Sequence, residues 1–502
     1  MNIGPLLLAS AISLGWAQAA NAQQQLGAEQ QTSTQIPSDT GDQTVVAPVT
    51  SADWLLGADV LAASEQQAES EQDTDPGEGR PGTEARLARE QLYAPRDTTG
   101  RVFQLLPTSN HVLGDWGGLR TKLEDAGVIP MVWLTINAAT NLSGGLDQGA
   151  TAPGEFEIML NFDMERIAGI KGGLVHFKVA HRFGKSLAHD YIGNVFGPQQ
   201  IYGYTFTQLN QIYYEQALLD HRLVLRAGRF AVMNDFQASP YNYVFISQAF
   251  CGNPFGIFLN SPGVSAFVGA WGAFAKILPT RRTYIMAGAY NGDPNVREAK
   301  YHGLNFSMHG PLFAIAEVGY QRNGLPGDKG KLGNYKVGVW YDNAAFPAFE
   351  TGEVKRGTWG WYAMADQVLI PFGDDPEEGR GLGIFGSLTG ATDTKRQIEP
   401  LFFTAGLVAR GFMDSRPRDA IAVGVARGNF SKHLQRAQRQ GMLIGPVPGV
   451  MTHETVAEAN YRFDFDKSAF FVQPGFQYIF RPGGTGEAKN AAVVATQIGF
   501  HF

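Results

Sequence analysis

Cysteine is almost absent from this sequence, which contains only Cys251 among its 502 residues. A lone cysteine excludes an internal disulfide framework, so we expect Cys251 to act as a small apolar side chain. Long apolar runs are also missing after the first twenty residues, and no later segment reaches the roughly 18 consecutive apolar positions that a transmembrane helix requires. Any part of this chain that spans a membrane must therefore consist of strands.

Charged residues are sparse as well, at 17% of the chain, while 44% of the residues are hydrophobic. This composition is too polar for a helical membrane bundle, and the chain is too long for one ordinary soluble domain. The 61 glycines and the aromatic content of 12% favour a large β-rich architecture.

The N-terminal region predicts export. Residues 1–22 contain an apolar stretch from Ile3 to Trp16 and end with small residues at Ala20 and Ala22. This pattern predicts a signal peptide that is cleaved before Gln23. Residues 23–105 are rich in Gln, Ser, Thr, Asp and Glu and lack a sustained apolar period, so they predict a disordered acidic leader.

The excess of acidic residues belongs to this leader. It holds 14 acidic and 4 basic residues between positions 23 and 100, whereas the chain beyond residue 100 has 36 basic and 33 acidic residues. The folded part of the protein is therefore close to neutral.

From Val128 to Phe502 polar and apolar residues alternate in segments of about ten residues, which Gly, Pro, Asn and Asp clusters separate. In the segment 457–466, AEANYRFDFD, one face carries Glu458, Arg462 and Asp464 and the other is apolar or aromatic. A soluble sandwich also alternates, but rows of charge on many strands are typical of a barrel with lipid outside and a wet lumen inside.

We count 17 such segments. They begin near Val128, Glu155, Gly173, Leu209, Arg222, Val264, Thr283, Tyr301, Leu312, Asn334, Thr358, Gly381, Leu401, Ala420, Glu454, Ala469 and Ala492. Because single-chain bacterial barrels use an even number of strands, we predict a transmembrane antiparallel β-barrel of 16 strands over residues 128–502, with 18 as the alternative. The connections at 184–207 and 429–453 are long and others are tight, which is typical of extracellular loops and periplasmic turns.

The chain ends with NAAVVATQIGFHF, in which Val494, Ile498, Phe500 and Phe502 share one face. A last strand with alternating apolar residues and a terminal aromatic resembles the pattern that outer-membrane assembly machinery recognises. We therefore expect that machinery to be a partner of this chain, together with outer-membrane lipid.

Several short motifs follow one another along the chain: GDWGGLRTKLEDAGV (114–128), NLSGG (141–145), QIYYEQ (211–216), RAGRF (226–230), AYNGDPN (289–295), VGVWYDN (337–343), ADQ (365–367), RGFMDSRPRDA (410–420) and VQPGFQYIFRPGG (472–484). In this order and spacing they resemble the carbohydrate-selective outer-membrane porin family of the OprB type. The resemblance implies a short periplasmic helix in residues 106–127 before the first strand. It also implies an outer-membrane porin for passive, selective diffusion of carbohydrates, such as the monosaccharide glucose.

A selective pore for sugars needs polar groups that exchange hydrogen bonds with hydroxyls and an aromatic ring that stacks on C–H faces, all bound weakly enough to allow flow. Strand phase predicts that the polar candidates point inward; they are Lys178, Arg182, Glu215, Arg226, Asp342, Glu458 and Arg462. Trp340 shares a face with Asp342 and is the candidate for stacking. Arg229 joins the list because the resemblance places basic residues at the constriction, although it needs a bulge or a strand end to face the lumen with Arg226.

Other functions find little support in the sequence. The histidines show no metal-binding spacing, the Gly-rich stretches lack a phosphate-loop context, and the near-neutral barrel has no basic cluster for nucleic acid. We therefore expect no enzyme activity, no cofactor and no metal site. A general diffusion porin, a secreted carbohydrate-binding β protein and an energy-coupled receptor are the alternatives, and the oligomeric state, monomer or homotrimer, stays open.

Overall fold

A computed structural model describes residues 111–502 apart from 202–204, 251–252, 262–267, 324–329, 374–379, 444–446 and 466–468. The predicted signal peptide (1–22), the acidic leader (23–105) and Cys251 lie outside the described residues, as does the start of the segment 106–127. No helix among the described residues is long and apolar enough to cross a membrane.

In the described part of the chain, seventeen strands form one antiparallel sheet. They are β1 (Val128–Gly145), β2 (Gly149–Thr151), β3 (Gly154–Asp163), β4 (Gly173–Phe183), β5 (Phe206–Leu218), β6 (Leu223–Phe230), β7 (Ala270–Ile277), β8 (Thr283–Asn291), β9 (Leu312–Arg322), β10 (Gly333–Pro347), β11 (Val354–Pro371), β12 (Gly381–Ala391), β13 (Leu401–Arg410), β14 (Ala420–Asn429), β15 (His453–Phe465), β16 (Phe470–Phe480) and β17 (Lys489–His501). Each long strand pairs with its neighbours in the chain, and β1 pairs with both β3 and β17, so the sheet closes.

The predicted 16-stranded barrel is confirmed. The three-residue strand β2 only extends the hairpin of β1 and β3, and the other 16 strands make the closed wall. Of the 17 predicted segments, the one near Tyr301 is wrong, because Tyr301 ends the short 3-10 helix η8 (Ala299–Tyr301). The following residues alternate, with Leu304, Phe306 and Met308 exposed, but they pair with no strand that the structure describes.

The remaining helices are short and belong to the connections before and between the strands. They are η2 (Trp116–Gly118), α4 (Leu119–Asp125), α5 (Met164–Ala168), the π-helix η3 (Ala188–Ile192), η4 (Val232–Asn234), η5 (Asn242–Val244), η6 (Phe255–Ile257), η7 (Pro294–Arg297), α6 (Lys432–Arg439) and η10 (Pro482–Gly484). The predicted short helix before the first strand is confirmed as α4. Gly117 and Gly118 make the turn into it with φ of 67° and 89°, values that favour glycine.

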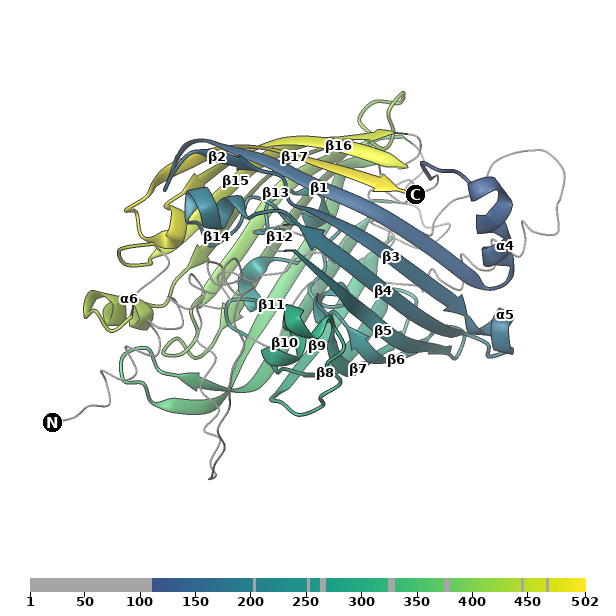
Figure 1. Cartoon of the computed structure of the whole chain (residues 1–502), viewed down its shortest axis with the longest axis horizontal. Helices are drawn as coiled ribbons and strands as arrows, with labels where there is room; N and C mark the ends of the chain where they lie inside the picture. The colour runs from purple at the N-terminus through teal and green to yellow at the C-terminus, as the bar shows by residue number, and fades with distance from the viewer. Residues whose placement is uncertain are drawn as a thin grey trace, which may run out of the picture.

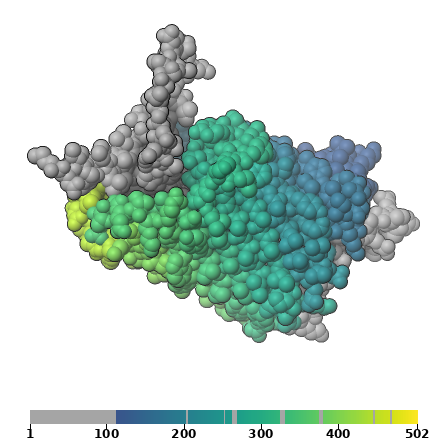
Figure 2. All heavy atoms as spheres, turned by 90° about the horizontal axis from the view of Figure 1, so that it is seen from below, coloured from purple at the N-terminus to yellow at the C-terminus, as the bar shows by residue number. Residues whose placement is uncertain are grey.

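The two ends of the barrel differ, as Figure 1 shows from the side. Helices α4 and α5 and the C-terminus lie at one end, and α6 lies at the other. The long connections 184–205 and 430–452 follow the strands that run away from α5, so both belong to the α6 end, as the predicted loop asymmetry requires. On the face seen in Figure 2, the coloured strands of the wall present a continuous surface.

Alternation along each strand separates an apolar outer face from a polar inner face. In β10 Val337 and Val339 are 58% and 52% exposed, whereas Lys336 and Asp342 on the other face are buried. These exposed apolar side chains are suited to contact lipid, which would cover them in place of protein. Trp359 and Trp361 lie on this outer face of β11.

The seam between the first and last strands carries an additional contact from α4. The Arg120 guanidinium donates to the carbonyls of Pro130 and Phe502 and lies 4.4 Å above the Trp116 ring. The Phe502 N–H donates to the carbonyl of Val132 at 2.8 Å. Helix α4 thus covers the closed seam and holds the last residue of the chain.

Candidate pore constriction

The lumen is narrowed by the connection between β6 and β7. Every described residue from 231 to 261 is buried except Asp235 and Tyr243, which are half-buried. A connection that is buried in this way has folded into the lumen of the barrel. Its backbone N–H and C=O groups then need hydrogen-bond partners on the wall. Residues 194–201 of the β4–β5 connection are also buried throughout.

Polar side chains of the inner wall supply those partners for the inserted segment 231–261. Glu317 on β9 accepts from the Gln237 N–H at 2.9 Å, and Lys336 on β10 donates to the Ala238 carbonyl at 2.5 Å. Asp366 on β11 accepts from the Ser239 hydroxyl at 2.8 Å. These bonds fix the segment to three neighbouring strands.

Aromatic rings complete this attachment. Phe245 and Phe250 of the inserted segment stack with ring centroids 4.2 Å apart, and Phe245 packs edge-on against Phe385 of β12 at 5.4 Å. Edge-to-face and stacked rings at such distances add to the free energy of burial. The segment is therefore a packed part of the barrel interior.

Arg226 lies on β6, shortly before the inserted segment begins, and its side chain keeps some contact with solvent. It pairs with Glu215 of β5 at 2.7 Å and with Asp235 at 2.8 Å, and the three side chains are 13%, 12% and 14% exposed. Its guanidinium lies 4.4 Å from the ring centroid of Tyr213 and 4.7 Å from that of Phe274. A fixed cation with two accessible carboxylates and aromatic walls can exchange hydrogen bonds with a polyol.

The two predicted basic residues of β4 form ion pairs with β3. Lys178 pairs with Glu157 at 2.7 Å and Arg182 with Glu155 at 3.2 Å, and all four side chains are at least 95% buried. The structure thus brings Lys178 and Arg182 together on the inner face, but each has a carboxylate partner on the neighbouring strand.

The predicted residues of β10 and β15 lie on the inner face and are covered. Asp342 accepts from the Ser261 hydroxyl, and Trp340 packs against Phe313 with ring centroids 6.4 Å apart. The Arg462 guanidinium stacks 3.4 Å from the Phe471 ring centroid. Glu458 accepts from two N–H groups of the inserted segment, at Ile246 and Ser247.

Arg229 does not join Arg226. No register shift interrupts β6, so the bulge that would bring both arginines to one face is missing, and Arg229 shares its face with Ile212 and Trp271. It is fully buried and donates to the Val296 carbonyl at 3.4 Å, near Arg297. The structure separates the two predicted arginines.

Strand phase was not used to predict several carboxylates of this interior, among them Asp235, Glu317 and Glu454. Glu317 and Glu454 follow the inward phase of β9 and β15, so strand alternation alone indicates their face. Asp235 lies in the connection 231–269, where no periodic pattern exists, and nothing in the sequence marks it.

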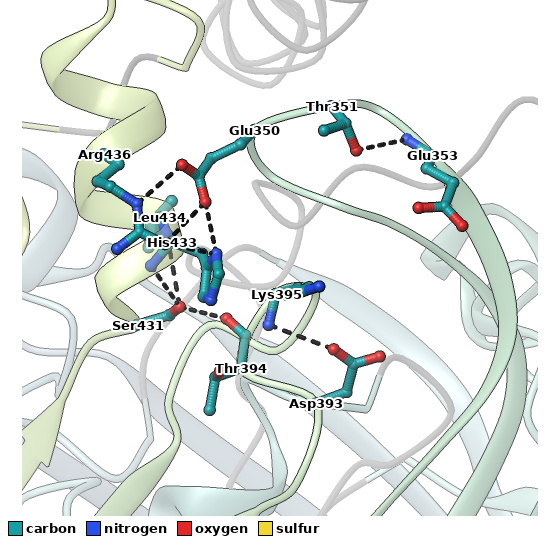
Figure 3. A network of polar contacts seen from close by, with 10 residues as sticks. All are labelled: Glu350, Thr351, Glu353, Asp393, Thr394, Lys395, Ser431, His433, Leu434 and Arg436. Carbon is teal, nitrogen blue, oxygen red and sulfur yellow. Dashed lines mark hydrogen bonds and ion pairs between the residues drawn. The ribbon is translucent and has the colours of Figure 1, made fainter.

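At the opposite end from α4, three connections are tied together by a polar network (Figure 3). Glu350, between β10 and β11, accepts from Arg436 of α6 at 2.8 and 3.0 Å and contacts His433. Ser431 caps α6 by accepting from the His433 N–H at 3.1 Å, and it donates to the Thr394 carbonyl. Hydrogen bonds from Arg436 and His433 lower the pKa of Glu350 to about 2.

We expect Glu350→Ala to loosen the connection 348–353. Trypsin should cleave the folded barrel after Lys355 or Arg356 faster, by no more than about fivefold because the ion pair is at the surface. Thr351→Ala is the control. The Thr351 hydroxyl accepts from the Glu353 N–H, which belongs to the same connection, and so does not join it to α6.

Lowering the pH should weaken the contact of Glu350 with Arg436 and His433 only under strongly acidic conditions. Because the pKa of Glu350 falls from 4.5 to about 2, the contact contributes stability above pH 4.5 and loses it as the pH falls towards 2. Pepsin at about pH 3.5 should still cleave Glu350→Ala faster than the parent, and equal rates would contradict the assignment.

Comparisons with known proteins agree with this architecture. The family model described as "Carbohydrate-selective porin, OprB family" matches residues 147–502. Porin B of Pseudomonas aeruginosa is 29% identical over 78% of this chain and 91% of its own length, and the putative porin QuiX of Acinetobacter baylyi is 27% identical over 78% and 93%. A high-pH structure of Pseudomonas putida OprB is similar with a TM-score of 0.71 and 26% identity, covering 79% of this chain and 99% of that structure.

Proposed function

The chain belongs to the OprB family of carbohydrate-selective porins and is an outer-membrane carbohydrate porin, and we propose that monosaccharides such as glucose are its preferred solutes. We further propose that Arg226, Glu215 and Asp235 contact the sugar. The observation that carries this proposal is their exposure of 12% to 14%, which exceeds that of Lys178, Arg182, Asp342 and Glu458.

The chemistry of this cluster suits weak recognition of a polyol. Arg226 offers several donors in a fixed plane, while Glu215 and Asp235 accept, so adjacent hydroxyls can be bridged. The rings of Tyr213 and Phe274 lie beside the guanidinium and supply apolar surface for C–H groups. Binding must stay weak because a tight site would stop flow.

The other predicted contacts stay proposals of lower rank. Lys178, Arg182 and Arg462 are buried cations of the inner wall, and each contacts another residue of the wall. Trp340 is the proposed stacking ring. Arg229, near the end of β6, is a further candidate. Asp342 and Glu458 hold the inserted segment, which supports a positioning role for them.

Family and fold are those of channel proteins, and we propose that this chain binds sugars without any reaction. Residues 1–22 are proposed as the signal peptide, 23–105 as the leader, 106–127 as the periplasmic segment and 128–502 as the barrel. The proposed partner in biogenesis is the outer-membrane assembly machinery, which would read the last strand. The barrel acts as a monomer or as a homotrimer.

Single-channel recording with a panel of sugars tests the proposed preference. Glucose should reduce the ion current of the parent channel in a saturable manner, with weaker block by disaccharides, because the proposed sugar contacts come from one small cluster around Arg226. The alternative is a general diffusion porin, whose current would fall only with solution viscosity and would never saturate. A channel that behaves in that way would refute the sugar site.

A further inference from the structure

We propose that Glu454 and Glu458 of β15 are positioning residues that set the width of the pore, because they hold residues 195–196 and 246–247 of two buried connections. This proposal rests on the porin function, since it concerns the same pathway. It assigns to two wall carboxylates a role in shaping the constriction instead of contacting the solute.

Glu458 holds the inserted segment 231–261 by its backbone. One carboxylate oxygen accepts from the Ile246 N–H at 2.7 Å and from the Asn460 amide at 2.8 Å, and the other accepts from the Ser247 N–H at 2.8 Å. The side chain is 2% exposed. Both oxygens are therefore occupied by protein, which leaves a sugar hydroxyl no ready access to them.

Glu454 lies four residues away on the same inner face and holds a second segment. Its carboxylate accepts from the Val195 N–H at 2.9 Å and from the Phe196 N–H at 2.8 Å, both in the β4–β5 connection. It also accepts from the Gly483 N–H at 2.7 Å, in the connection between β16 and β17. One fully buried carboxylate thus joins two connections that are far apart in the sequence.

The two segments are also bonded to each other next to these carboxylates. Gly197 and Gln248 exchange two hydrogen bonds, from the Gly197 N–H to the Gln248 side chain at 3.1 Å and from the Gln248 N–H to the Gly197 carbonyl at 2.9 Å. The Ser247 hydroxyl donates to the same Gly197 carbonyl at 3.1 Å. Gly197 and residues 246–248 are therefore bonded to each other beside β15.

Backbone N–H groups in a buried connection must find acceptors, and a carboxylate that accepts two of them makes charge-assisted bonds that fix position as well as orientation. Removing the carboxylate leaves buried donors without partners, which favours movement of the segment towards water. A displaced segment widens the pathway. The wall of the barrel itself, held by its strand ladder, should persist.

The test compares Glu458→Ala and Glu458→Gln with Val456→Ala in planar bilayers. Val456 lies between the two glutamates on the same inner face and is fully buried, so its truncation matches the site without removing an acceptor. Folding is checked by migration on unheated gels. We expect Glu458→Ala to raise single-channel conductance about twofold or more and to weaken glucose block about tenfold.

Glu458→Gln should lie between alanine and the parent, because its amide oxygen still accepts one of the two N–H bonds, and Val456→Ala should conduct like the parent. A folded Glu458→Ala channel with parental conductance would overturn the proposal. If the alanine variant does not insert, parental conductance and current noise in Glu458→Gln would overturn it equally.

Failure of the sugar function can be told apart from failure of this inference. If glucose does not block the parent channel, the proposed solute is wrong. The conductance of the Glu458 variants still reports the width of the pore in that case.

Discussion

Deleting Phe502 should lower the amount of folded barrel in the outer membrane about tenfold or more while synthesis continues, for two reasons. The residue closes the seam, since its N–H donates to Val132 and its main-chain oxygen accepts from Arg120. Two lost hydrogen bonds cost about 1 kcal/mol each. It is also the terminal aromatic that we expect the assembly machinery to read.

Arg120→Ala separates these two causes. This variant removes the contact of α4 with the last residue but leaves the last strand intact. If recognition dominates, it should insert at near-parental yield and unfold at a lower temperature, which heat-dependent migration on gels measures. Undiminished insertion of the chain without Phe502 would exclude a recognition role for the terminal residue.

Replacing Arg226 by alanine should change sugar block and ion selectivity together. The arginine supplies the donors of the proposed sugar site, so the glucose block should weaken about tenfold, corresponding to about 1.4 kcal/mol. It is also the cation between Glu215 and Asp235. Its loss leaves two carboxylates unneutralised in the lumen, and the permeability of cations relative to anions should rise.

Arg226→Lys and Arg229→Ala are informative beside this variant. Lysine keeps the charge but loses the planar set of donors, so it should retain the ion selectivity and lose part of the sugar block. Arg229 lies on the other face of β6, and its truncation should affect the sugar block less than that of Arg226. A folded Arg226→Ala channel that glucose blocks as well as the parent would move the search to Lys178, Arg182 and Arg462.

The alternation of apolar and polar residues was sufficient to predict most strands of the barrel wall. A strand between lipid and a wet lumen must present apolar and polar residues in turn, so strands such as β10 and β15 could be predicted from their own residues. The same rule predicted a strand near Tyr301 in error. The segment after Tyr301 alternates, but among the described residues it forms no strand ladder, although the His302 carbonyl accepts from the Leu209 N–H of β5.

The face of a residue could thus be read from the sequence, whereas its partner could not. Alternation placed Glu458 and Asp342 inside the barrel, but an inward carboxylate can meet a sugar, a neighbouring cation or an inserted connection. The choice depends on the path of residues 231–261, which have no repeating pattern. That path is set by contacts with strands up to 229 residues away in the chain, such as Gln473 with Val244. Only the closed barrel brings these positions together, and with them the acceptors that the backbone of a buried connection requires.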